Sequence, residues 1–242
     1  MPRYIYTTYA LIAFVLIMLV LLPFVIIASF FGINGGNFIY KLCNIWGSIW
    51  YFFVGIWHKE IYEVPHTTQK PLIFVANHIS YLDIPAIVKG IHQPYRALGK
   101  YEMVKIPVFG WIYRSAVILV DRSSHEKRAR SVRALKAALA KDISILLFPE
   151  GTFNETGKPL KFFYDGAFRI AIETQTNIKP LILPDTVNRL HYTNIFSLTP
   201  GINRVIYLEE ISVQGYTLKD IEQLKETVFA AMQKALLKYG SW

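Results

Sequence analysis

The sequence predicts an α/β domain preceded by a pair of apolar helices, and two observations lead to this prediction. Residues 10–31 form a run of 22 residues without a charge, and a second uncharged run extends over residues 42–57. From Pro65 onward, short β-branched or apolar runs alternate with helical stretches and turns, which is typical of α/β domains. We therefore assign residues 1–60 to membrane-anchoring helices and residues 61–242 to the α/β domain.

The composition of the 242-residue chain suggests contact with lipid. Hydrophobic residues make up 53% of it and charged residues only 18%, compared with about 25% charged in an ordinary soluble domain. The net charge of +9 suits an anionic membrane surface, a phosphorylated substrate or nucleic acid. Beyond this basicity no nucleic-acid-binding motif occurs, so we predict no nucleic-acid partner. The single cysteine, Cys43, excludes an intrachain disulfide and a cysteine-rich metal site.

The first apolar run is long enough to cross a membrane. As a helix its 22 residues measure about 33 Å, which matches the hydrocarbon thickness of roughly 30 Å. The run is longer than the apolar region of a signal peptide, and no small-residue cleavage site follows it, so we expect it to be retained. Pro23 would kink or break a helix there. Whether the run spans the bilayer or lies in one leaflet stays open.

The second run follows a glycine-rich segment at residues 32–36, which predicts a turn. At 16 residues the run is short for a span and favours a helix that lies at the membrane interface. Trp46, Trp50, Phe53 and Trp57 recur every three or four residues, and tryptophan prefers the headgroup boundary. The alternative is a stripe that packs against the rest of the protein.

The second part of the chain is expected to form strands at 72–76, 116–120, 143–148, 179–183 and 204–208. Helices are expected at 124–141 and 217–239. The helix at 124–141 contains six basic residues. They form either an ordinary solvated face or a surface for anionic lipid headgroups.

His78 is the first candidate for chemistry, because it follows directly on the strand at 72–76. The carboxyl ends of strands are where open α/β sheets place their ligands. Asp83, five residues later, can reach the imidazole if the chain turns into a helix near Ser80. A histidine held in this way can act as a general base. Taken alone, this spacing more often marks a helix-capping aspartate beside a structural histidine.

Three further blocks follow in order between about residues 71 and 185. They are the stretch from Gly99-Lys100 to Asp121-Arg122, the turn Phe-Pro-Glu-Gly-Thr at 148–152, and Ile178-Lys179-Pro180 before an apolar strand. In the turn, glycine lets backbone N–H groups approach an anion, and Thr152 adds a hydroxyl donor. Together with the Asn-His-x-x-x-x-Asp run at 77–83, this ordered set resembles the PlsC-type lysophospholipid acyltransferases, the glycerophosphate acyltransferase superfamily.

The resemblance implies a mixed, largely parallel sheet flanked by helices and preceded by a membrane-embedded helix pair. It implies that residues 61–242 are an acyltransferase domain that converts 1-acyl-glycerol-3-phosphate to phosphatidic acid at an inner, cytoplasmic membrane, with the catalytic domain on the cytoplasmic side. The donor would be acyl-CoA or acyl-carrier protein, without a metal or other cofactor. The catalytic pair would be His78 and Asp83. The substrate-binding residues that we carry over from the matched blocks are Asn77, Ser80, Lys100, Arg122, Glu150, Gly151 and Thr152.

Two departures from the family pattern leave the acceptor open. The family turn reads Glu-Gly-Thr-Arg, but Phe153 stands at the arginine position, and the usual Phe-Lys-x-Gly is Phe-Tyr-Asp-Gly at 163–166. Arg122, Lys100 and Lys161 remain to meet a phosphate. Another lyso-lipid, such as a lyso-aminolipid, is therefore an alternative acceptor. From a different class, a catalytically silent lipid-binding protein is distinguished by comparing the parent with His78→Ala.

Overall fold

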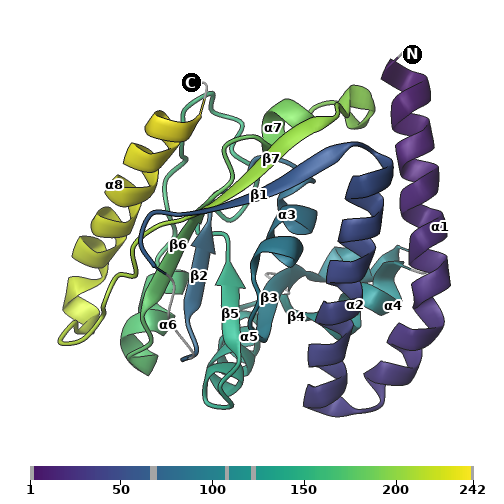
Figure 1. The fold of residues 1–242 in the computed structure, drawn as a ribbon. Coiled ribbons are helices and arrows are strands. Elements are labelled where there is room, and N and C mark those ends of the chain that lie inside the picture. Colours follow the sequence, from purple (N-terminus) through teal and green to yellow (C-terminus); the bar gives the residue numbers. More distant parts are fainter. Residues whose placement is uncertain (1–2, 66–69, 107–108, 121–123, 241–242) are drawn as a thin grey trace.

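The computed structural model describes residues 3–65, 70–106, 109–120 and 124–240 (Figure 1). The strands are β1 Ile56–Tyr62, β2 Ile73–Ala76, β3 Tyr95–Lys100, β4 Val117–Val120, β5 Ser144–Leu147, β6 Ile178–Ile182 and β7 Gly201–Tyr207. The α-helices are α1 Arg3–Ser29, α2 Gly32–Phe53, α3 Asp83–Gly90, α4 Phe109–Ala116, α5 His125–Leu139, α6 Gly166–Thr174, α7 Thr186–Arg189 and α8 Ile221–Tyr239. Short 3₁₀ turns are η1 Tyr101–Lys105, η2 Ile195–Ser197 and η3 Leu218–Asp220.

The strands form one seven-stranded sheet in the order β1-β7-β6-β2-β5-β3-β4. The five strands from β6 to β4 are parallel, whereas β7 pairs antiparallel with β6, and β1 runs parallel to β7. This arrangement confirms the predicted mixed, largely parallel sheet. Because the carboxyl ends of the five parallel strands share one edge, the loops after the neighbouring strands β2 and β5 adjoin each other there.

Successive side chains of β2 enter two separate apolar cores on opposite faces of the sheet. Ile73 and Val75 belong to the larger core, which α5, α6 and α8 cover. Phe74 and Ala76 belong to a smaller core, which is completed by α3. The sheet is thus flanked by helices on both faces, and all four β2 side chains are buried.

All five expected strands are present, with ends that differ from the predicted ones by up to three residues. The two expected helices correspond to α5 and to η3 with α8.

Two strands, β1 and β3, were not predicted from the sequence. The last residues of the apolar run at 42–57 belong to β1, an edge strand whose middle residues His58, Lys59 and Glu60 interrupt any apolar run. The boundary placed between residues 60 and 61 lies inside this strand. β3 was missed because its six residues include two cations and a glycine.

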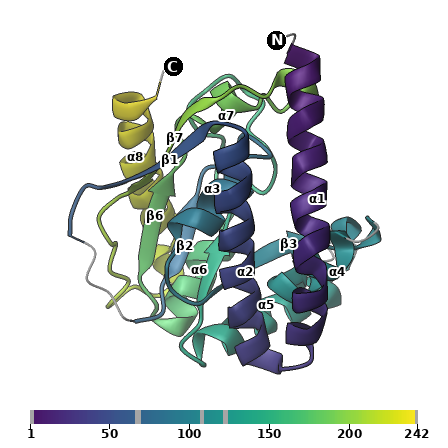
Figure 2. The same cartoon turned by 45° about the vertical axis from the view of Figure 1, so that its right-hand side comes forward.

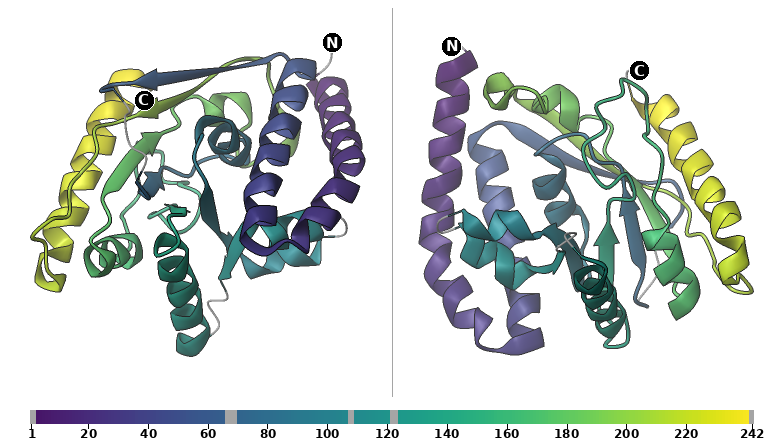
Figure 3. Two further views of the ribbon diagram at one scale, coloured as in Figure 1. Left: turned by 60° about the horizontal axis from the view of Figure 1, so that its bottom comes forward. Right: turned by 180° about the vertical axis from the view of Figure 1, so that it is seen from behind.

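The helix pair α1 and α2 stands as an antiparallel hairpin at the end of the molecule opposite α8 (Figures 1, 2 and 3). α1 is continuous through Pro23, so the expected break does not occur. Its 27 residues are long and apolar enough to cross a membrane, and most of its most hydrophobic window is not buried by the protein. Large apolar side chains, among them Leu16, Val20 and Phe24, are exposed along it.

The predicted glycine-rich turn is wrong in its extent. Only residues 30 and 31 separate the two helices, and Gly35 and Gly36 lie inside α2. A Cβ atom at Gly35 would lie 1.8 Å from the carbonyl oxygen of Ala28, and one at Gly36 would lie 2.3 Å from the guanidinium of Arg96. These glycines therefore serve close packing of α2 rather than a turn.

The aromatic stripe predicted for the membrane interface does not form one lipid-facing surface. The indole N–H groups of Trp46 and Trp50 donate to the carbonyl oxygens of Phe14 (3.2 Å) and Ala10 (2.8 Å) in α1. For these two residues the packing alternative is correct. Trp57 is exposed but belongs to β1. The sequence pattern correctly placed Trp46 and Trp50 on one face of a helix. We assigned this face to lipid, although it packs against α1, because tryptophan occurs in both environments.

Candidate active site

The loop after β2 brings His78 and Asp83 together. The Nδ1 atom of His78 lies 2.9 Å from Oδ2 of Asp83. The same oxygen accepts the backbone N–H groups of Ile79 (2.7 Å) and Ser80 (2.8 Å). The Asp83 side chain is fully buried, and that of His78 is 20% exposed. Asp83 is therefore held inside the protein, whereas His78 is accessible to an incoming molecule.

The geometry also selects one tautomer of His78. An ionised carboxylate only accepts hydrogen bonds, so the Nδ1 atom of His78 carries the proton that points to Asp83. In the neutral ring, Nε2 then holds the lone pair that can accept a proton from a substrate. Among the described residues, the other oxygen of Asp83, Oδ1, is buried without a hydrogen-bond partner. All of the observed hydrogen bonding of this carboxylate is thus directed at the loop that carries His78.

Asn77 and Ser80, which we carried over as substrate-binding residues, are buried and bonded to backbone. Asn77 Oδ1 accepts the N–H of Leu183 at 2.7 Å, and its Nδ2 donates to the carbonyl of the same residue at 3.3 Å. Ser80 Oγ donates to the carbonyl of Leu190 at 2.6 Å. These contacts tie the loop that carries His78 to the chain that follows β6. A contact of either residue with substrate stays a prediction.

The turn after β5 forms the opposite wall of the site. The ring of Phe148 stacks on His78 with ring centres 4.0 Å apart. Gly151 has φ +73°, a conformation that glycine adopts without strain and that allows this tight turn. Asn154 N–H donates to the carbonyl of His78 at 2.8 Å. The turn is therefore bonded to the backbone of the residue that it faces.

Glu150 is a second fully buried carboxylate beside the pair. Its Oε1 accepts the backbone N–H of His78 at 2.9 Å, and its Oε2 accepts that of Lys161 at 2.8 Å. Burial raises the pKa of Glu150 to about 7, although the two backbone hydrogen bonds oppose that shift. We predicted Glu150 as a substrate-binding residue, and its contacts are those of a residue that positions His78 and Lys161.

Two of the remaining substrate-binding candidates, Thr152 and Lys100, lie at the same edge of the sheet. Thr152 is exposed, and its Oγ1 accepts a hydrogen bond from Lys161 Nζ at 2.7 Å. Lys100 is exposed at the end of β3, two strands from β2. Arg122 lies outside the described residues. A cation thus lies directly on the Glu-Gly-Thr turn, at Lys161.

The sequence reading missed two aromatic residues at the pair. The ring of Phe153 meets the edge of His78 with centres 4.4 Å apart. Tyr81, which is 55% exposed, contacts Phe153 with centres 4.9 Å apart. Phe153 had been noted only as a missing arginine. Nothing in the sequence alone indicated that its ring packs on His78, because the two residues are 75 positions apart.

In the part of the chain that the structure describes, no group of three or more His, Cys, Asp or Glu side chains is arranged to hold a metal ion. The chemistry that the described side chains offer is proton transfer at His78, next to an exposed turn with a cation.

Fold and site together define an α/β protein with a histidine and a buried carboxylate at the carboxyl edge of a largely parallel sheet. Residues 59–184, more than half of the chain, match the family described as Acyltransferase. The matched region contains His78, Asp83 and the Glu-Gly-Thr turn. The chain belongs to this acyltransferase family, as the resemblance predicted.

Several relatives have named activities. The 1-acyl-sn-glycerol-3-phosphate acyltransferase of Salmonella typhimurium is 30% identical over 166 residues, which cover 68% of this chain and 66% of that protein. An uncharacterized acyltransferase of Schizosaccharomyces pombe is 30% identical over 178 residues, with coverage of 72% and 63%. The match thus spans slightly less than two thirds of these curated relatives.

The crystal structure of the 1-acyl-sn-glycerophosphate acyltransferase PlsC from Thermotoga maritima has the same fold. It matches with a TM-score of 0.77 at 22% sequence identity, and the match covers 99% of both chains. The likeness therefore includes the helix pair as well as the sheet.

Proposed function

We propose that this protein transfers a fatty acyl chain from a thioester donor to the free hydroxyl of 1-acyl-glycerol-3-phosphate, which gives phosphatidic acid. The observation that carries this proposal is the His78–Asp83 pair, with its 2.9 Å contact, in a chain that belongs to the acyltransferase family. The names of the relatives from Salmonella and several other organisms support the acceptor.

The reaction requires one base and no enzyme nucleophile. Nε2 of His78 removes the proton of the acceptor hydroxyl while that oxygen attacks the thioester carbonyl carbon. Asp83 stabilises the resulting imidazolium through Nδ1. The tetrahedral intermediate then collapses, the carbon–sulfur bond breaks, and the departing thiolate takes the proton back from His78. The products are the acylated lipid and the free thiol of CoA or of acyl-carrier protein, and no metal or other cofactor takes part.

The acceptor phosphate would lie near the Glu-Gly-Thr turn. Lys161, Lys100 and Arg122 are the cations available for it. A phosphate monoester carries about −1.5 to −2 charges near neutral pH, so two cations nearly neutralise it. The 2.7 Å contact between Lys161 Nζ and Thr152 Oγ1 supports the assignment of Lys161 to this group.

The protein would work at a membrane, because both substrates carry acyl chains. We assign α1 and α2 to anchoring, and the length and apolar exposed surface of α1 support this. An inner, cytoplasmic membrane with the catalytic domain on its cytoplasmic side is the location that we propose.

A product assay tests the proposal. The purified protein is offered a panel of lysophospholipids with acyl-CoA or acyl-carrier protein, and the products are identified by mass. We expect phosphatidic acid from 1-acyl-glycerol-3-phosphate and none from the His78→Ala variant. Equal product from parent and variant would refute the mechanism, and no acylated product from any acceptor would refute the function.

A second acceptor class has its own support. Phe153 brings an aromatic ring rather than a cation to His78, and Asp165 forms an ion pair with Lys225 at 3.0 Å. The family pattern has arginine at the position of Phe153 and lysine at that of Tyr164, next to Asp165, so both of these cations are missing here. A lyso-lipid with a less negative headgroup, such as a lyso-aminolipid, is therefore the alternative acceptor. The same panel separates the two, since each acceptor gives a product of different mass.

A further inference from the structure

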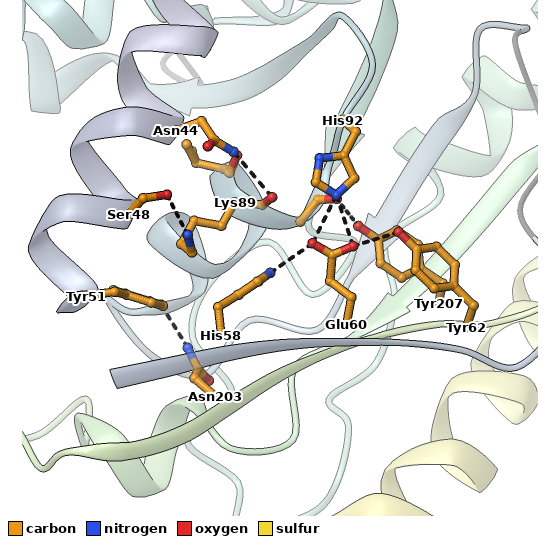
Figure 4. Close-up of polar contacts among 12 residues, drawn as sticks. Asn44, Ser48, Tyr51, His58, Glu60, Tyr62, Lys89, His92, Asn203 and Tyr207 are labelled. Carbon is orange, nitrogen blue, oxygen red and sulfur yellow. Dashed lines mark hydrogen bonds and ion pairs between the residues drawn. The ribbon is translucent and has the colours of Figure 1, made fainter. Parts of the chain in front are cut away.

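Helix α2 carries polar side chains on the face that it turns toward α3. Asn44, Ser48 and Tyr51 are four and three residues apart, a spacing that places them on one side of a helix. Figure 4 shows Asn44 and Ser48 directed at Lys89, at the end of α3. A helix needs no such groups to pack against lipid or against an apolar partner, so their function lies in the contact with α3.

These side chains hold the carboxyl end of α3. Nδ2 of Asn44 donates to the carbonyl oxygens of Val88 (3.1 Å) and Lys89 (3.3 Å). Lys89 Nζ donates to Ser48 Oγ at 2.6 Å and lies 5.8 Å from the centre of the Tyr51 ring. The last carbonyl groups of a helix have no partner within it, so α2 satisfies two of them for α3. We call Asn44, Ser48 and Lys89 the α2–α3 seam.

The other side of the same helix end is held by the sheet. The hydroxyl of Tyr207 donates to the carbonyl of Gly90. His92 Nε2 lies 2.9 Å from the carboxylate of Glu60 in β1 (Figure 4). The carboxyl end of α3 is therefore clamped between α2 on one side and the strands β7 and β1 on the other.

The amino end of α3 carries Asp83, its first residue. Eight residues of helix measure about 12 Å. A tilt of about 5° around the clamped end would move Asp83 by about 1 Å, and a misplacement of that size can cost about 10²-fold in rate. A small change at the seam is thus large enough, at the other end of the helix, to matter for proton transfer.

We propose that the α2–α3 seam positions Asp83, and through it His78, so that the alignment of the catalytic pair depends on the seating of the helix pair. Asn44, Ser48 and Lys89 are positioning residues and do not touch substrate. This inference rests on the proposed function, because it takes Asp83 as the partner of the base. It also gives the helix pair a role beyond anchoring: α2 links the lipid-facing hairpin to the reacting groups.

The first test separates positioning from binding. Asn44→Leu and Lys89→Met remove the seam contacts at nearly unchanged volume. We expect kcat to fall about tenfold or more, with the KM of both substrates unchanged, and Lys89→Arg to restore most of the rate. The matched controls are Asn34→Leu and Lys41→Met, at exposed positions of the same helix, which should keep the parent kcat.

The second test asks whether the seam acts through Asp83. In an Asp83→Asn background, Asn44→Leu should reduce kcat no further, because the group that it positions is already lost. A full additional tenfold loss would overturn the proposal, since it would mean a general structural effect. All rates are measured well below the thermal midpoint of each variant. Should Asn44→Leu not fold, Ser48→Ala, which removes one hydroxyl, must show a smaller loss of the same kind.

The outcomes distinguish this inference from the proposed function. A parent protein that acylates no lysophospholipid refutes the function. An active parent whose seam variants match the Asn34→Leu and Lys41→Met controls refutes the inference alone.

Discussion

The loop after β2 and the turn after β5 face each other across the site, and they are built differently. The β2 loop, residues 77–83, carries His78 and Asp83, the proposed reacting groups, and is fixed by buried polar side chains that bond to backbone. The β5 turn, residues 148–154, supplies ring surfaces and one buried carboxylate. In the proposed mechanism the β2 loop carries out the proton transfer, and the β5 turn shapes the site and positions His78.

The two buried carboxylates, Asp83 in the β2 loop and Glu150 in the β5 turn, differ in what they contact. Oδ2 of Asp83 contacts the imidazole of His78 together with two backbone N–H groups. Glu150 contacts backbone N–H groups alone, one with each oxygen. In the proposed mechanism Asp83 therefore acts on the charge of the His78 ring, whereas the contacts of Glu150 fix the position of the backbone. Asp83 and Glu150 are both buried acidic residues, but we assign them separate roles because their oxygens contact different groups.

The largest expected effect is the loss of the base. His78→Ala should lower kcat by about 10²–10⁴-fold with little change in the KM of the donor, measured by product formation in mild detergent. His191→Ala is the matched control, because the His191 ring bonds to its neighbour Thr193 and lies in another loop. If the two variants lost activity equally, the β2 loop would not be the reacting segment.

The next effect concerns stability and pH at the β5 turn. The carboxyl of Glu150 has an ordinary pKa of 4.5 when unfolded, and burial raises it to about 7 in the folded protein. Between these values the folded state binds more protons, so the free energy of unfolding should fall as pH rises from about 4.5 to about 7 and then level off. Over this full pH range the loss should be roughly 3 kcal/mol.

The measurement is the thermal midpoint between pH 5 and pH 8 for the parent and for Glu150→Gln. Glutamine does not titrate, so the difference between the two proteins should change across this range. Parallel curves would show that Glu150 keeps its ordinary pKa.

The sequence could predict the contact inside the β2 loop, but it could not predict the contact between the β2 loop and the β5 turn. The contact between His78 and Asp83 could be expected from five positions of spacing after a strand, because it is local, whereas their assignment as a catalytic pair came from the resemblance of the ordered blocks. The contact of Phe153 with His78 could not be expected, because two loops that are far apart in the chain create it. The same holds for the fold: the buried strands β2 and β5 are largely apolar runs, whereas the edge strand β1 carries His58, Lys59 and Glu60 in its middle and closely follows the apolar helix α2. The stripe of Trp46 and Trp50 was assigned to lipid because its partner, α1, is also apolar.

A kinetic test at Glu150 distinguishes a reacting group from a residue that only positions the backbone. The amide group of Glu150→Gln can accept one backbone N–H but turns an NH₂ toward the other, so either His78 or Lys161 loses its hydrogen bond. We expect kcat or acceptor KM to worsen about tenfold, which is about 1.4 kcal/mol for the loss of one bond to a charged group. A loss as large as that of His78→Ala would place Glu150 among the reacting groups.

The smallest expected effect lies at Phe153, and it tests what the β5 turn contributes to acceptor choice. The ring lies against His78 and contacts Tyr81, so Phe153→Arg removes an aromatic wall and adds a cation beside the Glu-Gly-Thr turn. Arginine binds phosphate with two hydrogen bonds, and KM for 1-acyl-glycerol-3-phosphate should fall a few-fold, by about 1 kcal/mol or less. The rate with a zwitterionic lysophospholipid should not improve.

Phe153→Leu, which keeps an apolar side chain, is the control that separates the effect of the added charge from the effect of the lost ring. If both variants improved equally with both acceptors, the ring would restrict access to His78 and the cation would be irrelevant. Improvement by arginine alone, with the phosphate acceptor alone, would mean that the turn after β5 tunes the headgroup while the loop after β2 carries out the transfer.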